Sequence, residues 1–131
     1  MNNEESRIQR ACVEYFRYKY PKYLIFSVPN GGLRNKITAR TLKAEGALAG
    51  VSNLIIVLPK RVIFIEMKTL KGKQSQSQKD FEEKIDMLSG YYFVCHSLDE
   101  FIELLNEITY ETDQNGAQKT KGVKGKPGRT V

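Results

Sequence analysis

The sequence contains only one histidine and two cysteines among its 131 residues. The single histidine, His96, argues against catalytic sites in which histidine activates a serine or cysteine nucleophile. Cys12 and Cys95 both lie in apolar segments, which favours two buried reduced thiols over a disulfide or a metal-binding pair. Histidine-based and thiol-based chemistry are therefore disfavoured.

Long apolar runs are also absent. No run reaches the roughly 18 residues of a membrane span, and the first residues, Met-Asn-Asn-Glu-Glu-Ser, lack the features of a signal peptide. The length suits one domain and leaves no room for a multidomain enzyme. The formal net charge of +6 favours a polyanionic partner, which can be a nucleic acid, an acidic protein or an anionic lipid. We expect a cytosolic protein without membrane contact.

Apolar spacing and turn residues predict an α/β domain with the element order α-β-α-β-β-α-β-α. Helices are expected over residues 4–19, from about 37 to 45, from 75 onward, and from 97 to 105 or 108. Strands are expected over 23–28, 53–58, 61–68 and 91–95. Because the second and third strands are almost continuously apolar, we expect a central sheet with helices on both faces.

The apolar spacing stops near Thr109, where lysine, glycine, threonine and glutamine become dominant. Such a composition cannot bury a core. We therefore predict a folded domain over residues 1–108 and a disordered basic tail over 109–131. The tail would add nonspecific affinity for nucleic-acid phosphates. A solubilising tail or a vector-derived segment left from expression also fits its composition.

An acid and a lysine lie two residues apart at the end of the third predicted strand, as Glu66 and Lys68. Alternate residues of a strand point to the same side, so the two side chains should converge while Met67 turns to the opposite layer. A carboxylate after Val-Ile-Phe-Ile is partly desolvated and needs a cation, either Lys68 or a metal ion. An isolated pair of this kind would be read as a structural ion pair.

The ordered set of motifs resembles the VRR-NUC family of the PD-(D/E)xK nucleases over about residues 5–106. Its pattern of a helical Glu, Gly-x-x-Asp, Glu-x-Lys and a downstream Gln is matched by Glu14, by Gly50 to Asn53, by Glu66-Met67-Lys68 and by Gln78. Pro29-Asn30-Gly31-Gly32 and the segment 42–46 also fit this resemblance. The resemblance implies a restriction-endonuclease-like core, with a central mixed sheet flanked by helices.

The resemblance also implies roles for these residues in a Mg²⁺-dependent or Mn²⁺-dependent nuclease. Glu66, the backbone carbonyl of Met67, the residue at position 53 and Glu14 would hold the ion, and Lys68 would activate or orient the attacking water. The resemblance makes Gln78 a further catalytic residue that points toward the site. Its alternative role is structural, because Ser75-x-x-Gln78 is also a capping box in which the amide returns to the backbone of the cap. The small stand-alone members of the family come largely from phages, which implies the cytosol of a bacterium or of an infected host.

A second set of residues is expected to contact DNA. Its members lie between the motif segments, either in the turn around residues 29–34 or on one face of the following helix, and are Asn30, Arg34, Lys36, Arg40 and Lys43. Instead of contacting DNA, the turn residues could only shape the loop. The helix residues could likewise form an ordinary solvated face.

Asn53 stands where the family has a metal-binding aspartate. An amide keeps the shape but removes one negative charge, so metal affinity and activity should fall while the fold stays the same. Natural drift and a deliberate Asp→Asn replacement both explain it, and the otherwise complete motif set favours replacement.

The sequence thus predicts a metal-dependent DNA endonuclease of the VRR-NUC type, impaired by Asn53. The resemblance further implies a homodimer that cuts branched DNA such as four-way (Holliday) junctions, reading shape through backbone contacts. Two alternatives stay open, namely a DNA-binding module without catalysis and a nuclease for linear or flap ends.

Overall fold

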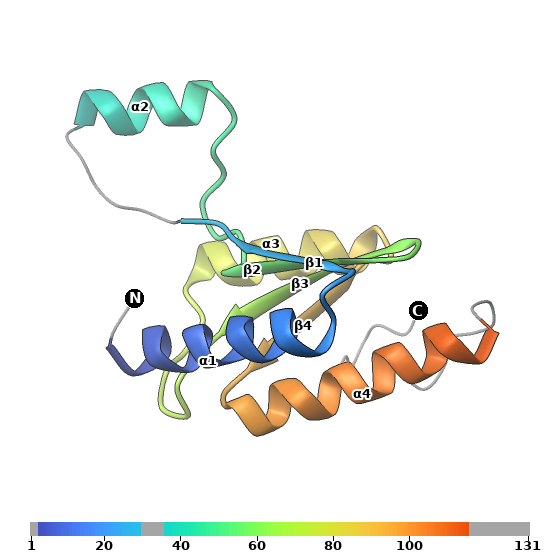
Figure 1. Cartoon of the computed structure of the whole chain (residues 1–131). Coiled ribbons are helices and arrows are strands. Elements are labelled where there is room, and N and C mark those ends of the chain that lie inside the picture. The colour runs from blue at the N-terminus through green and yellow to red at the C-terminus, as the bar shows by residue number, and fades with distance from the viewer. Residues whose placement is uncertain (1–2, 30–35, 116–131) are drawn as a thin grey trace.

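The chain folds into a four-stranded mixed sheet with helices on both faces (Figure 1). The computed structural model describes residues 3–29 and 36–115. The elements are α1 (Asn3–Lys19), β1 (Leu24–Ser27), α2 (Lys36–Ala44), β2 (Leu54–Leu58), β3 (Arg61–Met67), α3 (Gln76–Met87), β4 (Tyr91–Cys95) and α4 (Leu98–Asn115). The predicted α/β class, the flanked mixed sheet and the predicted element order are confirmed.

The strands lie in the order β1-β2-β3-β4, so the two central strands are β2 and β3. β1 and β2 are antiparallel, as are β2 and β3, whereas β4 runs parallel to β3. Pro59 and Lys60 form the tight turn between β2 and β3, and Lys60 has a positive φ of 64°. Proline followed by a residue with positive φ is the pattern of a type II turn.

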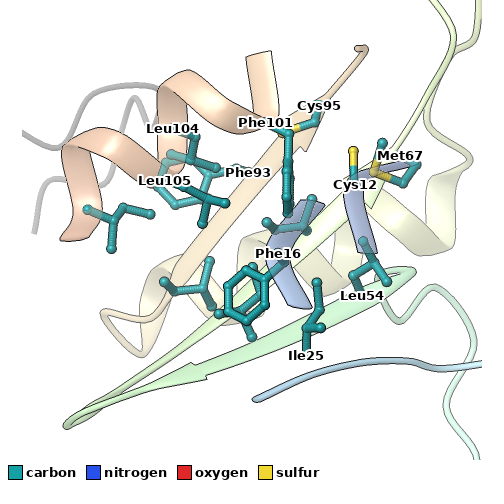
Figure 2. Close-up of a cluster of buried hydrophobic side chains, with 14 of the residues drawn as sticks. Cys12, Phe16, Ile25, Leu54, Met67, Phe93, Cys95, Phe101, Leu104 and Leu105 are labelled. Carbon is teal, nitrogen blue, oxygen red and sulfur yellow. The ribbon is translucent and has the colours of Figure 1, made fainter. Parts of the chain in front are cut away.

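Helices α1 and α4 cover one face of the sheet and enclose the main core (Figure 2). Cys12 and Phe16 of α1 and Phe101 and Leu105 of α4 are fully buried against the strands. Alternate residues of β2 and β3 point into the same core and are Leu54, Ile56, Leu58, Ile63, Ile65 and Met67. This face follows the period-2 rule for strands and the period-3.6 rule for helices.

Helix α3 packs on the opposite face through aromatic rings. The ring of Phe81 lies 5.4 Å from that of Phe64 in an edge-on arrangement at 81°, and 6.0 Å from the ring of Tyr92. Since Phe64 pairs with Tyr92 across β3 and β4, these two strand residues form the platform for α3. The same face of β3 continues to Glu66, two residues beyond Phe64.

Helix α2 stands away from the rest of the chain (Figure 1). Within the described residues it packs against no other helix or strand, and residues 39–49 are exposed. Its two connections leave from the end of β1 and return to the start of β2. α2 is therefore an excursion from one end of the sheet.

Helix α4 continues to Asn115, beyond the predicted end at residue 105 or 108. Residues 109–115 are helical, so this part of the predicted disordered tail is corrected. Extending a formed helix costs far less than nucleating one, and the hydroxyl of Thr109 donates to the carbonyl of Leu105 inside the helix. Residues 116–131 of the predicted tail lie outside the described residues. None of the described helices is long and apolar enough to cross a membrane.

Gly50 joins the loop before β2 to the first turn of α3. Its φ is +89°, and a Cβ at this position would collide with the backbone carbonyl of Ser77. Only glycine meets both conditions at low cost. The loop that leads to Asn53 is thereby held against the helix that contains Gln78.

Gly50→Ala should lower the free energy of unfolding by at least about 2 kcal/mol, because it adds strain at positive φ to a backbone collision. Gly46→Ala is the matched control, since Gly46 has a φ of +109° but nothing within 4 Å of the added Cβ. Urea denaturation should show a distinctly smaller loss for Gly46→Ala. Equal losses at the two positions would mean that the contact of Gly50 with α3 does not matter.

Candidate metal centre

A cleft of about 420 Å³ opens at the end of the sheet where β1 and β3 end and β2 begins. It is bordered by the first turns of α1 and α3. Its lining residues are Glu5, Gln9, Ser27, Val28, Pro29, Asn53, Glu66, Lys68 and Gln78. Four of the predicted site residues, Asn53, Glu66, Lys68 and Gln78, therefore meet in one cleft.

Glu66 is the most deeply buried polar side chain of the cleft, with 1% of its surface exposed. Its Oε2 accepts a hydrogen bond of 2.8 Å from Nε2 of Gln78 and lies 4.0 Å from Nζ of Lys68. Its other oxygen, Oε1, is buried and has no hydrogen-bond partner within the described part of the chain. The carboxylate is thus compensated on one side only.

Burial raises the pKa of Glu66 from its ordinary value to about 7. Desolvation is the largest cause, the ammonium of Lys68 lowers the pKa in part, and the negative charge of Glu5 raises it further. A cation in the cleft would favour the ionised form. Glu66 is therefore close to the point at which a proton and a cation compete for it near neutral pH.

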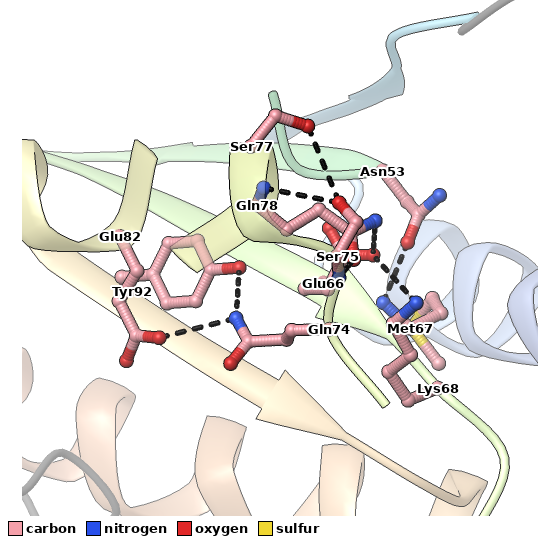
Figure 3. A network of polar contacts seen from close by, with 10 residues as sticks. All are labelled: Asn53, Glu66, Met67, Lys68, Gln74, Ser75, Ser77, Gln78, Glu82 and Tyr92. Atoms are coloured by element: carbon pink, nitrogen blue, oxygen red, sulfur yellow. Dashed lines mark hydrogen bonds and ion pairs between the residues drawn. The ribbon is translucent and has the colours of Figure 1, made fainter. Parts of the chain in front are cut away.

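Gln78 completes the predicted capping box and also points into the cleft toward Glu66 (Figure 3). Its Oε1 accepts from the backbone N–H of Ser75 at 2.8 Å, and the hydroxyl of Ser75 accepts from the backbone N–H of Gln78, which completes a capping box at the start of α3. Its Nε2 donates to Glu66. One amide therefore fixes the helix start and orients the carboxylate.

Asn53 holds the backbone at the end of β3. Its Oδ1 accepts a hydrogen bond of 2.6 Å from the backbone N–H of Met67. This bond determines the orientation of the amide, because the reverse orientation would place two donors against each other. Nδ2 consequently lies on the branch turned away from Met67 (Figure 3). An amino group is a donor and cannot ligate a cation, whereas an aspartate would place a second oxygen on this branch.

Met67 occupies the opposite layer from its two charged neighbours, as the strand pattern predicts. Its side chain is 1% exposed and lies in the core beneath α1 and α4. Glu66 and Lys68 share the face toward α3. The strand thus separates an apolar anchor from a polar pair.

Helix α1 contributes Glu5 and Gln9 to the cleft in place of the predicted Glu14. Glu14 lies about two and a half turns after Glu5, is exposed, and borders an adjoining hollow that shares Gln9 and Ser27 with the cleft. The predicted placement of Glu14 in the metal site is therefore corrected. Glu5 and Gln9 were missed although they continue the buried positions Cys12 and Phe16 toward the start of the helix.

The predicted DNA-contacting residues lie apart from the cleft or outside the described residues. Arg40 and Lys43 are exposed on α2, and Lys36 begins that helix. Asn30 and Arg34 lie in the segment 30–35, which the structure does not describe. In chain order α2 lies between β1 and β2, and the end of β1 and the residue before β2 border the cleft.

The loop before α3 is held by a second polar network (Figure 3). Nε2 of Gln74 donates to the hydroxyl of Tyr92 and to a carboxylate oxygen of Glu82, both at 3.1 Å. Tyr92 is fully buried beneath α3. Gln74 therefore ties the segment between Lys68 and α3 to the sheet and to α3.

The remaining candidates for chemistry stay outside this site. Cys12 and Cys95 are free and buried, and burial raises the pKa of each thiol to about 12. His96 lies 3.1 Å from Glu100 at the start of α4. The two cysteines are thus buried free thiols, as predicted.

The donor set of the cleft fits a hydrated divalent cation only partly. Among the described residues, no group of three or more histidine, cysteine, aspartate or glutamate side chains could hold a metal ion. The cleft nevertheless offers the unpartnered Oε1 of Glu66 and the carboxylate of Glu5. An aspartate at position 53 would provide a third acidic group of the kind that Mg²⁺ prefers.

Comparisons with models of protein families, with characterised proteins and with solved structures find no match to this chain.

Replacing Glu66 by glutamine should change how stability depends on pH. The folded pKa of Glu66 exceeds its unfolded value, so its contribution to stability is present below pH 4.5 and is lost as pH rises through 7. The Glu66→Gln variant cannot ionise at this position and so does not lose this stability. As the pH rises from 4.5 to 8, the free energy of unfolding of the variant should gain about 2–3 kcal/mol relative to that of the unsubstituted chain.

Chemical denaturation in EDTA over this pH range provides the measurement. Glu14→Gln is the matched control, because Glu14 is exposed and lies outside the cleft. Its pH profile should parallel that of the unsubstituted chain. A parallel profile for Glu66→Gln as well would contradict the burial of an uncompensated carboxylate.

Proposed function

We propose that this chain is a DNA endonuclease of the VRR-NUC type, with a restriction-endonuclease-like core and a dependence on Mg²⁺ or Mn²⁺. The observation that supports this most strongly is the buried Glu66 carboxylate, whose Oε1 lacks a partner among the described residues while Lys68 and Gln78 hold its other oxygen. A structural ion pair would not need an open oxygen in a cleft. A cation site does.

Different residues of the cleft would have different roles in phosphodiester hydrolysis. Glu66, the backbone carbonyl of Met67, position 53 and Glu5 would hold the ion, with Glu5 replacing Glu14. The bound ion would neutralise the phosphate charge and lower the pKa of a water molecule. Lys68, with a side chain 14% exposed and 4.0 Å from Glu66, would stabilise the negative charge that develops on the phosphate.

Gln78 positions this machinery. Its hydrogen bond to Glu66 Oε2 leaves Oε1 as the open ligand, and its bond to Ser75 fixes the carboxamide on the first turn of α3. Gly50 supports the same turn from the other side. The carboxylate would therefore be preorganised before the cation binds.

DNA would reach the cleft along α2. Arg40 and Lys43 lie three residues apart on this exposed helix, so they share one face, and Lys36 begins it. Asn30 and Arg34 lie outside the described residues, and their contact with DNA stays a prediction from the sequence. A projecting basic helix beside a cleft fits phosphate contacts that read the shape of branched DNA, and a homodimer would supply two cleavage sites for a four-way junction.

Asn53 should leave the chain inactive or impaired. The hydrogen bond from Met67 occupies one lone pair of the only oxygen of the amide, and the second branch is Nδ2, which is a donor. This orientation adds a physical reason to the loss of charge. It fits either origin of Asn53, a replaced aspartate or natural drift.

The same orientation favours a second candidate, a DNA-binding module without catalysis. In that protein, the cleft would have lost its cation while α2 kept its basic residues. A nuclease for linear or flap ends is a variant of the first proposal and differs only in substrate shape.

Restoring the acid separates the candidates. Asn53→Asp should cleave DNA in Mg²⁺ or Mn²⁺ at a rate at least about 100-fold above the unsubstituted chain, because the second carboxylate oxygen provides a ligand without removing the bond to Met67. Four-way, flap and linear substrates assayed in parallel identify the preferred shape.

Lys68→Ala and Glu66→Gln in the Asn53→Asp background should each abolish the gained cleavage. Glu14→Gln in that background should retain it, because Glu14 lies outside the cleft. Binding of branched DNA without cleavage by Asn53→Asp would leave the non-catalytic module as the function.

Reversing the charge on α2 tests the DNA surface. Arg40→Glu with Lys43→Glu should weaken binding and reduce the slope of log Kd against log salt by about 1–2, because each lost phosphate contact removes roughly 0.9 from that slope. Fluorescence anisotropy at several salt concentrations measures both quantities.

Lys22→Glu with Lys60→Glu is the matched control. It changes net charge by the same amount, but both residues are exposed near the other end of the sheet, at the start of β1 and in the turn between β2 and β3. An equal salt slope for the two double variants would show that α2 is not the DNA surface.

A further inference from the structure

Two buried oxygens of the cleft lack a partner within the described part of the chain. One is Oε1 of Glu66 on β3, and the other is Oε1 of Gln9 on α1. Both side chains line the same 420 Å³ cleft, although they come from elements on either side of it. Buried polar atoms are rarely left without a donor, so two such atoms in one cleft indicate a shared missing partner.

The position of Gln9 makes its polarity informative. It precedes Cys12 and Phe16 by three and seven residues, so it continues the face of α1 that enters the core. Gln9 is half-buried, but its Oε1 is buried, and burying an amide oxygen without a donor is costly. Packing alone therefore does not explain a glutamine here.

Glu5 lies one turn before Gln9 on the same side of α1 and also lines the cleft. Glu5 and Glu66 therefore border the same space, from α1 and from β3. The wall formed by α1 thus presents one acid and one amide toward the open oxygen on β3.

We propose that Gln9 is a positioning residue for the cation of the cleft, with Oε1 accepting from the hydrated ion held by Glu66. A hydrated Mg²⁺ or Mn²⁺ provides the donors that Oε1 of Gln9 lacks, and Mg²⁺ keeps several of its waters in protein sites. This inference rests on the proposed nuclease function. It adds a residue of α1 that none of the motifs contains.

The role of Gln9 predicts effects of opposite sign without and with metal. Gln9→Leu in the Asn53→Asp background should raise the melting temperature in EDTA, because it removes an unpartnered buried oxygen. The same substitution should weaken Mn²⁺ binding by about 10–100-fold, the usual effect of losing a group that supports a metal ligand. A purely structural glutamine would give the reverse, with lower stability in EDTA and unchanged affinity.

The experiment measures Mn²⁺ affinity by isothermal titration calorimetry and melting temperature in EDTA and in Mn²⁺. Gln9→Glu keeps the oxygen and should retain Mn²⁺ binding. Gln76→Leu is the matched control, because Gln76 is exposed on α3 and bonds to Asp80 outside the cleft. If leucine does not fit at position 9, Gln9→Ala gives the affinity comparison.

The outcomes distinguish the two proposals. If the Asn53→Asp form binds Mn²⁺ and Gln9→Leu or Gln9→Ala binds it equally well, the role of Gln9 is wrong and the nuclease proposal stands. If the Asn53→Asp form itself binds no Mn²⁺ and gains no melting temperature from it, the cation site of the proposed function fails. Loss of affinity in Gln9→Leu with retention in Gln9→Glu supports the inference.

Discussion

The burial of the Glu66 carboxylate is the constraint on which the rest of the site depends. A charge at the end of an apolar strand is costly unless it is paired, and here the pairing is incomplete, with one hydrogen bond from Gln78 and a lysine at 4.0 Å. The uncompensated burial raises the pKa of Glu66 to about 7. The cleft is therefore built around a carboxylate that favours either a proton or a cation.

Several elements converge on this carboxylate, and each is fixed by a separate local device. The capping box at Ser75 sets the start of α3, Gly50 holds the incoming loop against that turn, and Asn53 bonds the backbone beyond Glu66. Oδ1 of Asn53 accepts the N–H of Met67 and so satisfies the strand end, whereas the second branch of the side chain, Nδ2, is a donor and offers a cation no further oxygen. The fold is thus compatible with Asn53, whereas the proposed chemistry is not. Restoring the carboxylate at position 53 should therefore add DNA cleavage to a chain that otherwise only binds DNA.

Much of the fold could be predicted because its signals are local. The apolar spacing of α1, the continuous apolar strands and the turn at Pro59 and Lys60 each report short-range geometry. The cleft was predicted less completely. Glu66, Lys68 and Gln78 lie close together as expected, but Glu14 was assigned as the acid of α1 and Glu5, an acid on the same amphipathic helix, was missed. Only the packing of α1 against the sheet shows which turn borders the cleft. The end of α4 was missed because helix extension follows from the formed helix more than from apolar spacing.

A crystal structure of the Asn53→Asp form soaked in Mn²⁺, with anomalous difference maps, would show directly whether the cleft around Glu66 binds a divalent cation. We expect a Mn²⁺ peak in the cleft beside Glu66, position 53 and the side chains of Glu5 and Gln9 on α1. We also expect the bond between residue 53 and the N–H of Met67 to be retained. A cleft without a peak at saturating Mn²⁺, or a peak bound only by residues outside the cleft, would mean that the cleft is not a cation site.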